Sequence, residues 1–104
     1  MARFDYFRNP NPRTRDRVPY VVGIQTDLLE SLATRLVVPL VPASDFGKPI
    51  ERLNPLIRIG NRNFVLATAE MAAIPLKGLG EDVGSLKTHS AEILAAVDFL
   101  ISGF

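Results

Sequence analysis

Apolar residues fall into short, β-branched runs over most of the chain and into one longer segment at its end. Five runs have the composition of β-strands, and a sixth run follows them: residues 4–7, 18–25, 35–41, 56–59, 64–67 and 71–76. Residues 88–101 are rich in apolar residues at helical spacing and predict a C-terminal helix. Strands followed by a single helix predict a mainly β fold, an antiparallel sheet or small barrel against which the helix packs, and exclude alternating βαβ units.

Gly, Asn and Pro mark the turns between these runs. Residues 60–63 (G-N-R-N) separate two apolar runs and predict a tight hairpin, because Gly and Asn tolerate a positive φ. Residues 9–12 (N-P-N-P) predict a polar tip between the first two strands. Residues 42–55 contain three prolines and predict a surface connection with one short helical turn near residues 50–53. Residues 78–84 are predicted to form a glycine-rich turn before the helix.

The C-terminal helix has more apolar residues than one buried face requires. Its core-facing stripe is predicted to be Ile93, Leu94, Val97, Leu100 and Ile101, and its opposite face Thr88, Glu92, Ala95, Asp98 and Ser102. Either Thr88 or Ser90 is expected to cap its first turn. A helix this apolar is commonly covered on two sides, so the surplus predicts a homodimer or, alternatively, the docking of another partner.

The overall composition is that of a folded protein. The chain has 104 residues, 47% of them hydrophobic and 22% charged, which fits one domain over residues 1–104. It has no cysteine, so disulfides and sulfur-ligated zinc are excluded, and a reducing compartment is favoured. The first residues lack the apolar segment of a signal peptide, and no run reaches the roughly 18 apolar residues of a membrane span. We therefore expect a cytoplasmic protein without membrane contact.

Positive charge gathers near the N-terminus, although the whole chain has a net charge of only +1. Residues 1–24 hold five arginines and two aspartates, a net charge of +3, so the remaining residues sum to −2. On a hairpin, such charge typically marks a solvated edge that discourages strand-to-strand aggregation. A phosphate-binding patch is the alternative interpretation. We favour the solvated edge, because the net charge is too small to steer the whole molecule toward nucleic acid.

Metal, cofactor and hydrolase chemistry find little support in the sequence. His89 and Glu92 are three residues apart and could share a metal ion, but without a second His or any Cys two ligands do not make a site. Residues 78–84 read G-x-G-x-x-x-G, which is one residue off the dinucleotide fingerprint and includes two acids. A serine nucleophile needs a base, and the only histidine lies at a helix start. We expect no metal, no cofactor and no catalytic residues.

An endoribonuclease is the remaining enzymatic alternative. Arginine, threonine and glutamate can cleave RNA without histidine, and the chain offers a set of this kind: Arg13, Arg15, Arg17, Thr26 and Glu30. Their spacing does not require this activity. We therefore favour a non-enzymatic, protein-binding role.

Segments in the same order resemble the CcdB family of toxins from bacterial toxin–antitoxin modules. Residues 25–29 (Q-T-D-L-L) resemble the family's Q-S-D-I-I segment, residues 35–40 (R-L-V-V-P-L) its R-M-V-I-P-L strand, and residues 59–60 its H-I-G turn. Residues 71–76 (M-A-A-I-P-L) and 79–86 (L-G-E-D-V-G-S-L) are similar to its M-A-S-V-P-V and I-G-E-E-V…L stretches. The resemblance covers most of the chain, and a helix then reaches the C-terminus at the same distance.

The resemblance implies a homodimeric, SH3-like β-barrel with a C-terminal helix. Members of the family are not enzymes: they poison DNA gyrase by binding its A subunit and trapping the cleaved-DNA complex. A cognate antitoxin neutralises the toxin by folding its disordered tail onto the dimer. The joint complex represses its own operon, so DNA is contacted only through the antitoxin complex, and such modules serve plasmid maintenance.

The resemblance also implies a gyrase-binding set, formed here by Leu28, Leu29, Asp98, Ser102, Gly103 and Phe104. The family ends in Trp-Gly-Ile, and in this chain Ser102 stands at the position of the Trp, which is expected to stack on a gyrase arginine. Phe104 replaces the Ile and carries a ring of its own. The alternative within the family is a protein that binds its antitoxin and co-represses its operon but has lost or changed its gyrase target.

Overall fold

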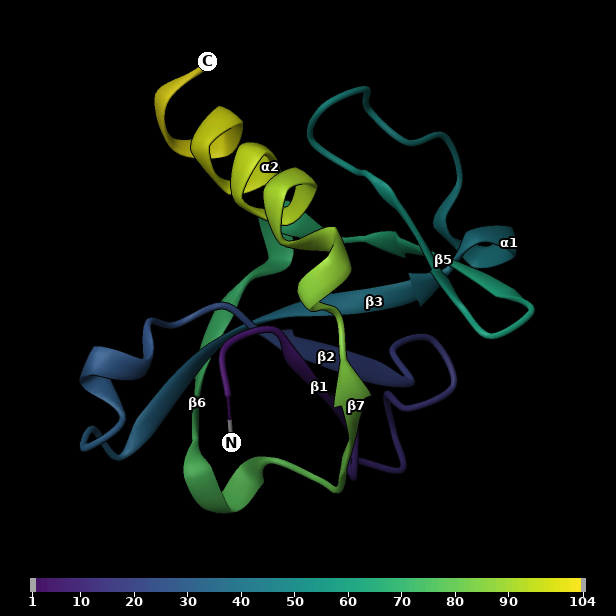
Figure 1. Ribbon diagram of the computed structural model, residues 1–104. Coiled ribbons are helices and arrows are strands. Elements are labelled where there is room, and N and C mark those ends of the chain that lie inside the picture. Colours follow the sequence, from purple (N-terminus) through teal and green to yellow (C-terminus); the bar gives the residue numbers. More distant parts are fainter. Residues whose placement is uncertain (1, 104) are drawn as a thin grey trace.

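Strand β3 (Thr34–Pro42) lies at the centre of the sheet in the computed structural model, which describes residues 2–103 (Figure 1). Six shorter strands complete the sheet: β1 Asp5–Arg8, β2 Tyr20–Gly23, β4 Leu56–Ile59, β5 Arg62–Leu66, β6 Ala72–Pro75 and β7 Asp82–Ser85. The helices are α1 (Ala43–Phe46) and α2 (Ser90–Ser102), with four 3-10 turns: η1 Asp27–Leu29, η2 Thr68–Glu70, η3 Leu76–Gly78 and η4 Lys87–His89. The predicted mainly β fold with a C-terminal helix is confirmed.

All strand pairs are antiparallel, in the order β4-β5-β3-β2-β1-β7. β3 divides one of its edges between two partners: Thr34–Val37 pairs with β6, and Leu40–Pro42 pairs with β5. Its other edge pairs with β2. β3 therefore pairs with three strands along its length, and the sheet curls around it into a half-barrel (Figure 1).

The core lies between the concave side of this sheet and α2 (Figure 1). Alternate strand residues point to this side, because side chains alternate along a strand. The largest contributors from the sheet are Val22, Val38, Leu40, Ile57, Phe64 and Leu66. From α2, Ile93 and Ala96 are fully buried. Burying each large side chain stabilises the fold by roughly 1.5–3 kcal/mol, so this cluster holds the helix against the sheet.

The glycine-rich segment differs from its prediction, because it contains a strand. β7 pairs with β1, so residues 82–85 close one end of the sheet and the predicted turn is shorter. Two glycines permit this close approach. A Cβ on Gly80 would lie 2.2 Å from the carbonyl oxygen of Arg8, and one on Gly84 would lie 2.8 Å from the Tyr6 ring. The segment is therefore glycine-rich because β1 lies directly against it.

The helix also differs from its prediction at both ends. It begins at Ser90, and His89 is its N-cap without a capping side-chain hydrogen bond, so neither Thr88 nor Ser90 has the predicted role. At the other end, two residues assigned to the core-facing stripe are exposed: Leu100 at 39% and Ile101 at 73%. The helix extends past the sheet, so its last turns have no core to pack against (Figure 1).

Candidate protein-binding site

The C-terminal end of α2 is an exposed tip, which we define as residues 98–103. The helix ends because Gly103 adopts a left-handed φ of 77°, and its N–H donates to the Phe99 carbonyl at 2.9 Å. Asp98, Ser102 and Gly103 are all exposed. Ile101 lies among them and adds the largest exposed apolar side chain of this tip. The helix tip therefore offers apolar and polar groups together to a partner.

Phe104, the sixth residue of the predicted gyrase-binding set, lies outside the described residues. Sequence reasoning missed Leu100 and Ile101 as surface residues. The signal that could have found them is the excess of apolar residues around the helix. A helix that packs one face against a sheet needs only one stripe of apolar residues, so further apolar residues lie on its surface.

The second part of the predicted set lies in the connection from β2 to β3, and we use the name η1 loop for residues 25–35, which include the first two residues of β3. Thr26 begins the 3-10 turn by accepting a hydrogen bond from the Leu28 N–H at 3.3 Å. Leu28 is 90% exposed and Leu29 46% exposed, and Leu32 adds a third exposed leucine. Such a group of exposed leucines on one loop is typical of a protein-binding surface.

The η1 loop is held in place by side-chain hydrogen bonds to its own backbone. The Gln25 amide donates to the carbonyls of Leu29 and Thr34 at 3.2 and 3.3 Å, and its oxygen accepts from the Leu36 N–H at 3.1 Å. The Arg35 guanidinium donates to the Thr34 carbonyl as well, and to two further carbonyls of the loop, those of Leu32 and Glu30. The exposed leucines are therefore presented on a preformed backbone.

The helix tip and the η1 loop do not meet within the chain. Figure 1 places the end of α2 at the top of the molecule and the η1 loop low on its left side. The structure brings Asp98, Ser102 and Gly103 together on the tip, and Leu28 and Leu29 together on the loop. A partner that contacts both must therefore be large or must engage two copies of the chain.

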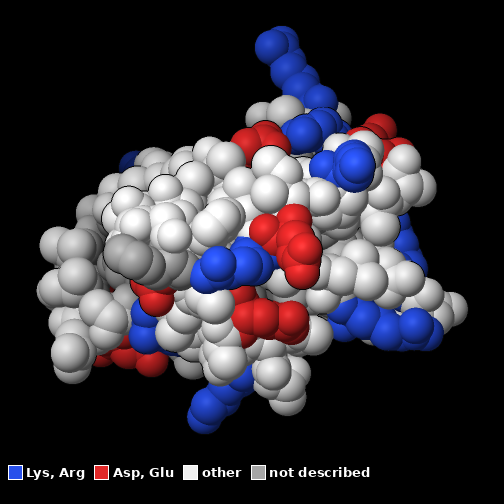
Figure 2. Space-filling model, turned by 90° about the horizontal axis from the view of Figure 1, so that it is seen from above, with Lys and Arg blue, Asp and Glu red and all other residues white. Residues whose placement is uncertain are grey.

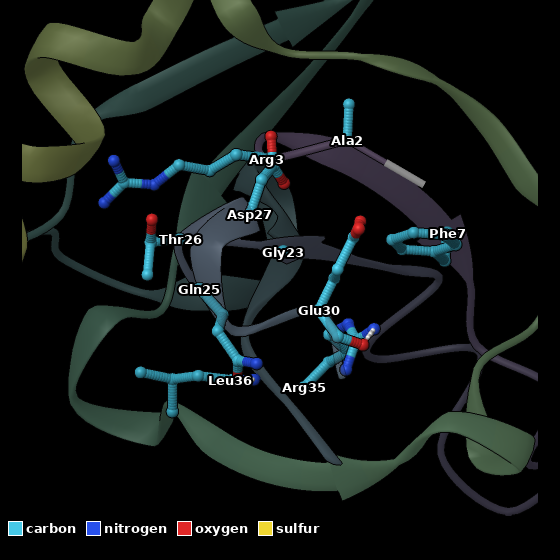
Figure 3. A pocket seen from close by; sticks show the side chains of 10 residues that line it. All are labelled: Ala2, Arg3, Phe7, Gly23, Gln25, Thr26, Asp27, Glu30, Arg35 and Leu36. Carbon is cyan, nitrogen blue, oxygen red and sulfur yellow. Dashed lines mark hydrogen bonds between the residues drawn. The ribbon is translucent and has the colours of Figure 1, made fainter. Parts of the chain in front are cut away.

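A small pocket lies beside the η1 loop (Figure 3). Its volume of about 20 Å³ has room for one water molecule and is far below the several hundred Å³ of a typical substrate site. Figure 3 shows Glu30 extended toward the side of Phe7, with the Arg3 guanidinium pointing away from that ring. Arg3 donates to the Ile24 carbonyl at 2.9 Å, which ties the N-terminal segment to β2. The pocket is therefore a packing gap where the N-terminal segment meets β2, and it is too small for a substrate.

A larger, open groove of about 370 Å³ lies between the β1–β2 loop and the start of β7. Arg8 and Glu81 both line the groove and form an ion pair at 2.9 Å, and the hydrogen bond to Glu81 raises the pKa of Arg8 above its ordinary value. Arg17 pairs with Glu70 at 3.2 Å. On the face seen in Figure 2, basic side chains lie in separate groups with acidic ones between them. The pairing of two of the hairpin arginines, Arg8 and Arg17, with glutamates favours the solvated edge over a phosphate-binding patch.

Within the described residues, neither the metal site nor the ribonuclease set considered from the sequence is brought together. Within residues 2–103 no three His, Cys, Asp or Glu side chains are grouped to hold a metal ion, and the His89 ring is hydrogen-bonded to Glu92. The ribonuclease set is divided: its arginines lie in the β1–β2 loop on the right of Figure 1, and Thr26 and Glu30 lie by η1 on the left. None of the helices in this part of the chain is long and apolar enough to cross a membrane.

The comparison with known protein families agrees with this geometry. The model of one family, described as "CcdB protein", matches residues 3–103. The match includes all seven strands, the η1 loop and the whole of α2. On this match and the fold described above, the chain belongs to the CcdB family.

Proposed function

We propose that this protein is the toxin of a type II toxin–antitoxin module. In this proposal it binds the A subunit of DNA gyrase and traps the cleaved-DNA complex, and a cognate antitoxin neutralises it. Membership of the CcdB family supports the proposal. The observation that carries it is that both segments matching the family's gyrase contacts expose apolar side chains, Leu28 in the η1 loop and Ile101 in the helix tip.

Apolar contact is the proposed source of affinity. Burial of one exposed leucine or isoleucine at an interface removes enough apolar surface from water to contribute roughly 1.5–3 kcal/mol. The hydrogen bonds of Gln25 and Arg35 support this role, because a loop that is already ordered loses less conformational entropy on binding. We expect a few central residues, with Leu28 the first of them, to dominate the binding energy.

With Ser102 at the position of the family's tryptophan, we expect a weaker contact with gyrase. A serine cannot supply the flat ring that a tryptophan would stack on an arginine, a contact of about 0.5–2 kcal/mol. The neighbouring Ile101 offers apolar area instead, although without the electrostatic attraction of a ring. The same observation favours our second candidate function, an antitoxin-binding co-repressor that has lost or changed its gyrase target.

We also propose that the protein is not an enzyme, acts as a homodimer and contacts DNA only through its antitoxin complex. The divided ribonuclease set and the small volume of the pocket beside the η1 loop support the first point. The separation of the helix tip from the η1 loop supports the second, since a dimer brings two copies of each surface to one partner. A stable dimer needs a buried area of at least about 1,000 Å². Light scattering of the purified protein measures its mass in solution and so tests whether it is a dimer.

Capture of purified gyrase A subunit tests the central proposal. Wild type should retain the subunit, Leu28→Ser should lose most of the capture, and Leu56→Ser should behave as wild type. Leu56 is a matched control because it is 55% exposed on β4, outside both candidate surfaces. In a reaction of gyrase with plasmid DNA, wild type should increase the amount of cleaved DNA.

Three outcomes contradict parts of the proposal. Failure of wild type to capture gyrase A or to increase cleaved DNA removes the gyrase target and leaves the antitoxin-binding function. Equal loss of capture by Leu28→Ser and Leu56→Ser removes the η1 loop from the site. Cleavage of a labelled RNA by the purified protein contradicts the non-enzymatic role.

A further inference from the structure

Arg52 has a backbone conformation that residues other than glycine seldom adopt. Its φ is 71°, in the left-handed region where the Cβ crowds the backbone. Within residues 2–103, Phe4 is the one other non-glycine residue with a positive φ, and core packing holds Phe4 in place. Arg52 is exposed, so packing of its side chain in the core does not account for its conformation.

Side-chain hydrogen bonds of Asn54 and Thr68 hold the loop around Arg52 against the core. The side-chain amide of Asn54 donates to the Leu66 carbonyl of β5 at 3.0 Å and accepts from the Ile50 N–H at 3.0 Å. The buried Thr68 hydroxyl donates to the Leu53 carbonyl at 2.5 Å. The loop is therefore attached to the core immediately on both sides of its strained residue.

This geometry directs the Arg52 side chain onto α2. Its guanidinium carbon lies 4.6 Å from the centroid of the Phe99 ring, within the range of a cation–π contact. Phe99 is half-buried and lies in the last part of the helix. The contact therefore joins the fixed loop to the segment that carries the helix tip.

The helix tip contains no fully buried residue. Ile93 and Ala96 are the buried residues of α2, and both precede the tip. The last turn of α2 contains no basic residue, although cations near a helix C-terminus stabilise its negative end. Arg52 brings a positive charge to this end from a neighbouring loop, in addition to its contact with the ring.

We propose that Arg52 is a positioning residue that orders the last turn of α2 through the Phe99 ring. It keeps Asp98, Ile101 and Ser102 in helical geometry before any partner arrives. The consequence for binding rests on the proposed function of the helix tip, whereas the ordering of the tip is a property of the free protein. A preordered tip loses less entropy on binding.

Backbone amide exchange of the free, full-length protein tests the ordering. We expect Arg52→Ala to increase exchange of the amides of residues 100–103 by about two- to fivefold, the factor that corresponds to an exposed cation–π contact. Arg52→Lys, which retains a cation, should restore slow exchange in large part. Arg58→Ala is the matched control, because Arg58 is an exposed arginine on β4 that donates only to the nearby Gly60 carbonyl.

Arg52→Gly separates ordering of the tip from general stability. Glycine relieves the left-handed strain and removes the guanidinium, so it should be more stable than Arg52→Ala toward denaturant and yet show the same fast exchange at the tip. Phe99→Leu should also increase this exchange, and adding Arg52→Ala to it should have no further effect. Wild-type exchange at residues 100–103 in both Arg52→Ala and Arg52→Gly overturns the proposal.

A binding measurement then distinguishes this inference from the proposed function. If wild type binds gyrase A, Arg52→Ala should weaken that binding by a similar two- to fivefold factor. If wild type does not bind gyrase A but the exchange difference is present, the proposed target fails and the positioning role of Arg52 stands.

Discussion

Tyr6 and Gly84 face each other across β1 and β7, and a Cβ on Gly84 would lie 2.8 Å from the Tyr6 ring. The ring is in turn packed edge-on against Tyr20, with centroids 5.4 Å apart, so it has a neighbour on its other side. Pairing of the last strand therefore depends on the absence of a side chain at Gly84, as it does at Gly80 just before the strand.

Gly84→Ala should destabilise the protein. The added methyl group must displace the Tyr6 ring or β7 itself, and such overpacking typically lowers the free energy of unfolding by about 1–3 kcal/mol. Denaturant unfolding followed by circular dichroism measures the change. Gly78→Ala is the control, because a Cβ there would meet only Pro75, at an ordinary 3.8 Å. Equal stability of the two variants would contradict the close packing of β7 on β1.

Asn54→Ala should also lower stability. The substitution leaves the Ile50 N–H without its side-chain acceptor and removes a donor from the buried Leu66 carbonyl. An unsatisfied buried polar group typically lowers the free energy of unfolding by about 1–3 kcal/mol. The midpoint of thermal unfolding reports the loss. Asn63→Ala, at an exposed position of β5, should leave the midpoint nearly unchanged.

Asp82→Asn should stabilise the protein at neutral pH. Burial and the hydrogen bond with the Asp5 side chain raise the pKa of Asp82 above its ordinary 3.8. The folded protein therefore binds this proton more tightly than the unfolded chain, and the contribution of Asp82 to stability falls as pH rises from about 3.8 through the raised value. The amide keeps an acceptor for the Gly84 N–H. The gain should be small, because the side chain is mostly exposed.

Unfolding measured between pH 3 and pH 7 isolates this effect. The difference between Asp82→Asn and wild type should grow with pH and should vanish in acid, where both side chains are uncharged. Asp45→Asn, an exposed substitution on α1, is the control for the loss of one negative charge. A constant difference at every pH would show that Asp82 does not titrate abnormally in the folded protein.

Ile101→Ser should weaken partner binding and leave stability unchanged. The side chain is 73% exposed, so its loss removes little buried area from the folded protein. At an interface the same loss should reduce affinity for gyrase A by about tenfold or more, since burying such a side chain contributes roughly 1.5–3 kcal/mol. Calorimetric titration measures this affinity. Ile50→Ser is matched in chemistry and exposure, at 57%, and should bind as wild type.

Local signals predicted the sheet well where a turn and its strands lie together in sequence. The β4–β5 hairpin is such a case, since Gly60 has the expected positive φ of 62° and the two strands pair across it. β7 was missed because its residues have weak strand propensity, and it becomes a strand only through its pairing with β1. The α1 helix was missed as well, because it has four residues and no capping side chain.

The sequence predicted which residues form the candidate site better than it predicted where they lie in the fold. The order of short motifs indicated the family, and Leu28, Leu29, Asp98, Ser102 and Gly103 are all exposed as a binding role requires. Their role in binding gyrase stays a prediction. Periodicity placed Leu100 and Ile101 in the core, because the pattern of one helix does not reveal where the supporting sheet ends.

The pairing of β1 with β7 joins Asp5 to Ser85, so the first strand of the sheet pairs with the last. Strand pairings this distant in sequence are slow to form, so we expect the half-barrel to close late in folding. The core that holds α2 takes side chains from both ends of this pairing, Phe4 before β1 and Leu86 after β7. Packing of the helix is therefore coupled to a contact between distant parts of the chain.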